Sequence, residues 1–137
     1  IKYIKYTFRI LAISTDVSSQ TPNYHLILEN KTWSGAQRYC RGKYTDLVSI
    51  RDQQQNEEVK IKGLNSITSF WIGLLCDDWQ WTDGGNSAYR NWGSGEPWES
   101  PSEDCHCGAV DPRSDFRWRD MNCQSRYKAL CLIKCSP

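Results

Sequence analysis

Hydrophobic positions fall into short runs separated by polar turns, which is typical of a domain that mixes strands and helices. Strand-like apolar runs occur at 24–28, 47–50, 70–75, 105–110, 116–118 and 127–133. The run at 70–75 is nearly all apolar and predicts a strand that is buried on both faces. Trp79 and Trp81 flank Gln80, and this alternation predicts a short strand with both indoles on one face.

Two segments carry the start signals of helices. Thr32 is placed to cap a helix over 33–41, because its hydroxyl can accept a backbone N–H of the first turn. Asp52 opens a second helix over 53–64, whose glutamines and charged residues stay in water. Leu64 is expected to face inward from the end of this helix.

The two ends of the chain and one internal segment break the pattern. Residues 1–22 join a charge-interrupted apolar run to a polar turn-forming run, so we expect a linker or connector there. The domain is expected over 23–134, followed by a tail at 135–137. Residues 84–104 show no helical or strand period and are rich in Gly, Ser, Asn, Pro and charge. A structureless segment of this length inside a compact domain is typical of a functional loop.

Composition narrows the class of protein. The chain has 137 residues and 39% hydrophobic residues, which fits one ordinary domain. Its net charge of +1 produces no strong positive electrostatic field that would attract nucleic acid or an anionic membrane surface. No apolar run is long enough to span a bilayer. Seven cysteines favour an oxidising compartment, so we expect a secreted protein or the ectodomain of a receptor.

Several landmarks in the chain resemble those of C-type lectin-like domains. They are WIGL at 71–74, WTDG at 81–84, GEP at 95–97, EDC at 103–105, WRD at 118–120, and the later cysteines Cys123 and Cys131. The stretch at 31–41, KTWSGAQRYCR, is similar to first-helix sequences of fish and macrophage-mannose-receptor-like members. The resemblance covers about 24–132 and implies an α+β fold. That fold has two helices, small antiparallel sheets and a long irregular ligand-binding loop, and it is stapled by disulfides.

The resemblance also implies a disulfide pattern. Six cysteines allow on the order of fifteen pairings, so spacing alone leaves the connectivity open. The family pattern, with an extra bridge found in some members including fish antifreeze types, implies the pairs Cys40–Cys131, Cys105–Cys123 and Cys76–Cys107. Cys135 is then left over. It is either a terminal thiol, a partner for a cysteine in a flanking segment, or one half of an interchain disulfide.

The long loop matches the family's calcium and sugar site in part. Calcium takes about six to eight oxygen ligands. The residues that match the family's acidic ligands, or that lie beside them, are Glu96, Glu99, Glu103, Asp104 and Asp120. The family's calcium takes two sugar hydroxyls into its coordination shell, and the proline after the glutamate, here Pro97, is usually cis.

Two positions depart from the family's pattern. Trp98 and Arg119 stand where the family has asparagines that bind both calcium and sugar. Trp98 has no acceptor oxygen, and Arg119 brings a positive charge with only donors. The resemblance therefore implies a degenerate calcium site, with Glu99 as a candidate substitute ligand. Alternatively, the acids form a solvated loop, or Arg119 forms an ion pair with Glu103 or Glu96 that replaces the charge of the metal.

The tryptophans of the loop have different expected roles. Trp92 resembles a buried loop anchor of the family. Trp98 has no such counterpart, and an indole on an exposed loop is suited to stack on a sugar or to anchor a partner. Its alternative role is to fold over the loop.

These observations predict a carbohydrate-binding C-type lectin domain that contacts a glycan or glycoprotein through Glu96, Trp98, Glu103, Arg119 and Asp120. The alternative is a calcium-independent module of the same fold that binds a protein. An enzyme is not expected, because no G-x-S-x-G turn, H-E-x-x-H helix or phosphate-binding loop occurs. His25 and His106 are expected to be ordinary strand histidines. Asn30-Lys31-Thr32 is a glycosylation sequon.

Overall fold

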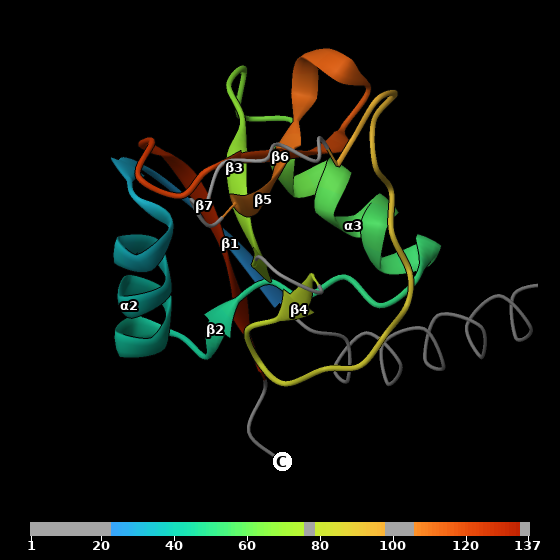
Figure 1. The fold of residues 1–137 in the computed structure, drawn as a ribbon. Coiled ribbons are helices and arrows are strands. Elements are labelled where there is room, and N and C mark those ends of the chain that lie inside the picture. Colours follow the sequence, from blue (N-terminus) through green and yellow to red (C-terminus); the bar gives the residue numbers. More distant parts are fainter. Residues whose placement is uncertain (1–22, 76–78, 98–105, 135–137) are drawn as a thin grey trace, which may run out of the picture.

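The computed structural model describes residues 23–75, 79–97 and 106–134 (Figure 1). Along the chain its elements are β1 (Asn23–Lys31), α2 (Trp33–Lys43), β2 (Asp46–Leu47), α3 (Gln53–Gly63), β3 (Phe70–Leu75), β4 (Gln80–Trp81), β5 (His106–Asp111), a 3-10 turn (Pro112–Ser114), β6 (Arg117–Asn122) and β7 (Tyr127–Ile133). The expected α+β class is confirmed. The strand predicted at 116–118 is longer than expected, and the strand predicted at 47–50 is shorter.

The strands form one sheet in the order β1-β7-β3-β5-β6, with β2 beside β7 and β4 beside β3. β3 and β7 run parallel, and every other pairing between described strands is antiparallel. β1 and β7, the first and last described strands, therefore lie side by side. β6 forms the opposite edge of this path, which is where the long loop meets the sheet.

Both helices begin at the caps that the sequence predicts. The Thr32 hydroxyl accepts the backbone N–H of Gly35 at 3.2 Å, and the Asp52 carboxylate accepts that of Gln55 at 2.8 Å. Each bond satisfies a donor that the first turn of a helix leaves without an intrahelical partner. The sequence therefore encodes the start of each helix locally.

The inward orientation expected for Leu64 is wrong. α3 ends at Gly63, and Leu64 is 66% exposed. A Cβ on Gly63 would lie 2.7 Å from the ring of Phe70, so the helix approaches the core at its glycine. Because Gly63 fills the contact position against β3, the next residue points away from it.

β3 separates two hydrophobic clusters, and this explains its continuous apolar sequence. Ile72 and Leu74 pack with the buried residues around α3, while Trp71 packs with those around α2. The two helices lie on opposite sides of the sheet (Figure 1). The Trp71 indole N–H donates to the Lys31 carbonyl at 2.8 Å, so its one polar atom is satisfied.

One predicted disulfide is confirmed. Cys40 of α2 is bonded to Cys131 of β7, with the Cα atoms 5.3 Å apart. The bridge ties the first described helix to the last strand, in the same cluster as Trp71. It closes a long stretch of the chain and restricts the unfolded ensemble accordingly.

The other two predicted pairings are wrong, because Cys107 is bonded to Cys123 at a Cα distance of 5.2 Å. Cys123 is therefore bonded to Cys107 and not to Cys105 as predicted. Because Cys107 is already bonded, it cannot form the predicted pair with Cys76. The reason lies in β5, where Cys107 is buried and Cys123 packs against the same cluster. Cys76, Cys105 and Cys135 lie outside the described residues.

Candidate functional site

The start of the long loop is fastened to β6. The Trp118 N–H donates to the Asn91 carbonyl at 2.8 Å, and the Gly93 N–H donates to the Trp118 carbonyl at 2.9 Å. Between these bonds, Trp92 forms an isolated bridge with Trp118. The loop then reaches the Glu96–Pro97 peptide bond, which is cis as the resemblance implies.

Trp92 has two roles at this point. It is half-buried, and its ring lies edge-on to Trp118 at 6.0 Å and to Trp79 at 4.7 Å between centroids. The predicted anchoring role is confirmed, since the ring packs against the core cluster that contains Trp118. Trp92 also forms part of the wall of a cavity, which the sequence alone does not indicate.

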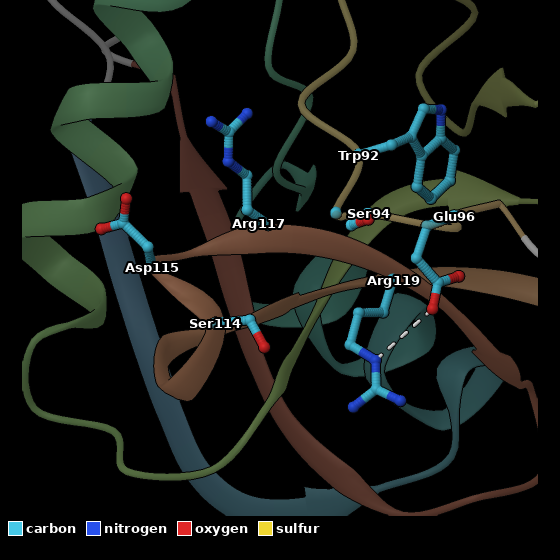
Figure 2. A pocket seen from close by; sticks show the side chains of 8 residues that line it. Trp92, Ser94, Glu96, Ser114, Asp115, Arg117 and Arg119 are labelled. Carbon is cyan, nitrogen blue, oxygen red and sulfur yellow. Dashed lines mark ion pairs between the residues drawn. The ribbon is translucent and has the colours of Figure 1, made fainter.

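Arg119 of β6 lies between two acidic groups. Its Nε is 3.6 Å from Glu96 Oε1, and its Nη1 is 3.2 Å from Asp111 Oδ2. Figure 2 shows the side chains of Glu96 and Arg119 pointing toward each other at the wall of the cavity. The predicted ion pair of Arg119 with Glu96 is confirmed, and Asp111 is a further partner that the sequence did not reveal.

Asp111 is held ionised by its surroundings. Its side chain is 3% exposed, and burial alone would raise the pKa of this carboxyl. Hydrogen bonds from the Arg113 backbone, Arg119 and Ser114 outweigh burial and hold the pKa of Asp111 below its usual range. Arg119 is therefore fixed against a stable negative charge at the end of β5.

Glu96 and Asp120, two of the predicted calcium ligands, are brought together. Glu96 Oε2 accepts the backbone N–H of Asp120 at 3.1 Å. The Asp120 side chain is 5% exposed, and its Oδ2 lies 3.3 Å from His106 Nδ1. Burial raises the pKa of Glu96, and the neighbouring Asp120 carboxyl raises it further, against the opposing effects of the Asp120 backbone N–H and of Arg119.

Glu96 and Asp120 are engaged by protein groups in this structure. Both Glu96 oxygens face protein donors, Asp120 Oδ2 lies beside the His106 ring nitrogen, and Arg119 has no lone pair to give to a metal. Within 23–75, 79–97 and 106–134, no group of three or more His, Cys, Asp or Glu side chains is placed to hold a metal. The other predicted ligands, Glu99, Glu103 and Asp104, lie outside the described residues, as does Trp98.

A cavity of about 850 Å³ opens between the loop and β6. The residues that give it its chemistry are Trp92, Ser94, Glu96, Ser114, Arg117 and Arg119 (Figure 2). Together with Asp115, they combine an aromatic face, two hydroxyls, two carboxylates and two guanidinium groups. Arg117 was not predicted from the sequence, although it lies two residues before Arg119 on β6 and so shares a strand face with it.

Comparison with known proteins places this arrangement in a family. The family model of the lectin C-type domain matches residues 29–133. The chain belongs to the C-type lectin domain family. The match includes the whole described part of the loop and the strand β6 that lines the cavity, so the confirmed fold and the family agree.

Individual relatives of this C-type lectin domain differ in length. L-selectin of Rattus norvegicus is 31% identical over 122 residues, which cover 83% of this chain and 33% of that protein. The chain thus spans about a third of that relative. C-type lectin lectoxin-Phi1 of Philodryas olfersii is 33% identical over 117 residues, covering 79% of this chain and 74% of that protein.

Solved structures share the fold. Human lithostathine superposes with a TM-score of 0.73 at 26% identity, covering 83% of this chain and 84% of that chain. A calcium-independent type II antifreeze protein superposes with a TM-score of 0.73 at 26% identity, covering 82% and 86%. The carbohydrate-recognition domain of mouse scavenger receptor C-type lectin gives a TM-score of 0.70 at 27% identity, covering 84% and 92%.

Proposed function

We propose that this domain is a binding module that recognises glycans in the cavity beside the loop, without calcium as a bridge to the sugar. The observation that supports this proposal most strongly is the lining of the cavity. A sugar has apolar C–H faces and a rim of hydroxyls that both donate and accept hydrogen bonds. The Trp92 ring offers an apolar wall, while Ser94, Glu96 and Arg119 offer polar groups around it.

Arg119 supports independence from calcium. In this chain the guanidinium supplies positive charge beside Glu96, at a distance of 3.6 Å. It also reaches Asp111 at 3.2 Å, so the start of the loop is held to the end of β5 without a metal. The antifreeze neighbour, described as calcium-independent, provides a precedent for such a variant of the fold.

We extend the ligand contact to Trp98, which directly follows Pro97 in the sequence. The remaining loop acids, Glu99, Glu103 and Asp104, are then polar contacts or solvated groups. The module is expected to act outside the cell, because the Cys40–Cys131 and Cys107–Cys123 bridges are stable in oxidising compartments. No helix in the described parts of the chain is long and apolar enough to cross a membrane.

To test this proposal, binding of a panel of mono- and oligosaccharides to the domain is measured by calorimetry in EDTA. Ser94 is exposed on the cavity wall, so Ser94→Tyr should fill the cavity and abolish binding. Ser34→Tyr is the matched control, since Ser34 is exposed on α2, across the sheet from α3. Trp98→Ala should weaken binding while leaving the melting temperature nearly unchanged.

Two outcomes would contradict the proposal. One is the absence of saccharide binding with and without calcium, which would turn the search to protein ligands. The other is equal binding by the Ser94→Tyr and Ser34→Tyr variants, which would place the ligand elsewhere. A large loss of stability in Trp98→Ala would mark that indole as part of the core.

A further inference from the structure

A second cavity continues the first one toward α3. It has a volume of about 290 Å³, and Asp115 and Arg117 line both cavities. In Figure 2 these two residues lie between the Trp92 side of the first cavity and the α3 helix. The two cavities therefore adjoin at these two residues, and we refer to the pair as the groove.

Each half of the groove has its own aromatic residue. Trp92 lines the first cavity and Tyr89 lines the second. Both rings lie edge-on to the buried Trp118, at 6.0 Å and 5.8 Å between centroids. A single core residue thus positions an aromatic wall in each half, which is a rigid arrangement for stacking on two separate rings.

One face of α3 supplies part of the polar lining of the second cavity, and the loop and the chain around the start of β6 supply the rest. Gln53 is exposed on it, and Lys60 lies 3.6 Å from Glu57 one turn away. Asn56 is buried, and its side-chain carbonyl accepts the Trp118 indole N–H at 3.0 Å. The amide NH₂ of Asn56 is therefore the group that is suited to donate a hydrogen bond to a ligand.

This second set of groups matches the hydroxyls of another sugar ring. It offers amide, ammonium and carboxylate groups beside a phenol, and burial raises the pKa of Tyr89, so its hydroxyl keeps its proton. The volume is at the lower end of small-molecule sites, which run from about 300 Å³ upward. That is space for one more unit of a ligand already held in the first cavity.

We infer that the ligand is an oligosaccharide of at least two sugar units, with one unit beside Trp92 and the next beside Tyr89. This inference rests on the proposed function and adds the length of the ligand to it. Arg117 lies at the junction, and its Nη1 donates to Asn91 Oδ1 at 2.7 Å, which fixes it between the two units.

The experiment compares each monosaccharide with the di- and trisaccharides built from it. Mannose, galactose, glucose and N-acetylglucosamine and their oligomers are the probes, and dissociation constants are measured by calorimetry in EDTA. The groove predicts that the best oligosaccharide binds about tenfold or more tightly than its monosaccharide, because the second unit adds its own hydrogen bonds.

α3 supplies a closely matched pair of variants. Gln53 and Lys60 line the second cavity, while Gln54 and Lys62 are exposed on the same helix and do not. The Gln53→Ala, Lys60→Ala double variant should lower oligosaccharide affinity to the level of the monosaccharide and leave monosaccharide affinity unchanged. The Gln54→Ala, Lys62→Ala double variant should bind both ligands as the unmodified domain does.

The outcomes separate this inference from the proposed function. Equal affinities for mono- and oligosaccharides would overturn the second subsite while glycan binding stands. Equal effects of the two double variants on oligosaccharide affinity would also overturn it. If no saccharide binds at all, the proposed function fails and the second subsite fails with it.

Discussion

Arg119 joins two acidic groups that come from separate parts of the chain. Glu96 belongs to the loop and Asp111 to the end of β5, and the guanidinium lies 3.6 Å and 3.2 Å from their oxygens. Because Asp111 is almost fully buried, its charge depends on the donors around it. The side chain of Arg119 therefore has a structural role as well as the role proposed for it in the cavity.

Arg119→Asn should lower the free energy of unfolding by about 1–2 kcal/mol, since a buried carboxylate loses a charged partner. Denaturation in urea measures the change. Arg117→Asn is the matched control, because Arg117 is exposed on the same face of β6 and bonds to the neutral Asn91. Equal losses of stability in the two variants would contradict the structural role of Arg119.

Asp83, in the turn after β4, carries a pH-dependent part of the stability. Burial would raise the pKa of Asp83, but hydrogen bonds from Ser49 at 2.7 Å and Gly85 at 2.9 Å, with the charge of Arg51, lower it. A pKa that is lower in the folded state stabilises the fold above the unfolded value of about 4. This stability is lost as the pH falls through the folded value.

Ser49→Ala should therefore reduce stability at neutral pH by about 1 kcal/mol and flatten the loss of stability below about pH 4. Melting temperatures measured from pH 7 down to the acid range give both quantities. If the melting temperature of the variant falls with pH as steeply as that of the unmodified domain, the Ser49 bond does not set the pKa of Asp83.

At the scale of elements, the fold was predictable where local signals are strong. The caps at Thr32 and Asp52 fix the helix starts, and the β3 sequence is apolar because it is buried on both faces. β6 was predicted too short because it is an edge strand whose two arginines and one aspartate look like a loop in the sequence. Its length is set by pairing with β5, which no local pattern reveals.

The disulfide between β5 and the end of β6 also depended on tertiary structure. In the alternating pattern of a strand, Cys105 and Cys107 are expected on the same face, so their spacing did not show which of them pairs with Cys123. The buried position of Cys107 against the cluster that Cys123 joins selects the second cysteine. Only the packed sheet carries that information.

Peptide mapping under non-reducing conditions should find Cys107 linked to Cys123. Replacing both with alanine should cost about 3 kcal/mol of unfolding free energy, as expected for a loop of roughly 15 residues. A Cys105→Ala variant is the control and should keep the bridge. A mapped link between Cys105 and Cys123 would contradict the assignment.

At the scale of the whole molecule, the site is assembled at the β6 edge of the sheet. The sequence landmarks identified Glu96, Arg119 and Asp120, because these lie in motifs that resemble the family's. They did not identify Tyr89 or the α3 residues, because these groups reach the groove only when α3 and the loop pack around Trp118. The chemistry of the groove is therefore a property of the fold.

We propose that Arg119 replaces the charge of a calcium ion in a glycan-binding domain. The measurement that tests it is a calorimetric titration of calcium into the EDTA-stripped domain, beside an Arg119→Asn, Trp98→Asn double variant. We predict no binding heat for the unmodified domain and binding for the double variant, which regains two oxygen ligands. Calcium binding by the unmodified domain, in the roughly micromolar-to-millimolar range of extracellular sites, would contradict the claim.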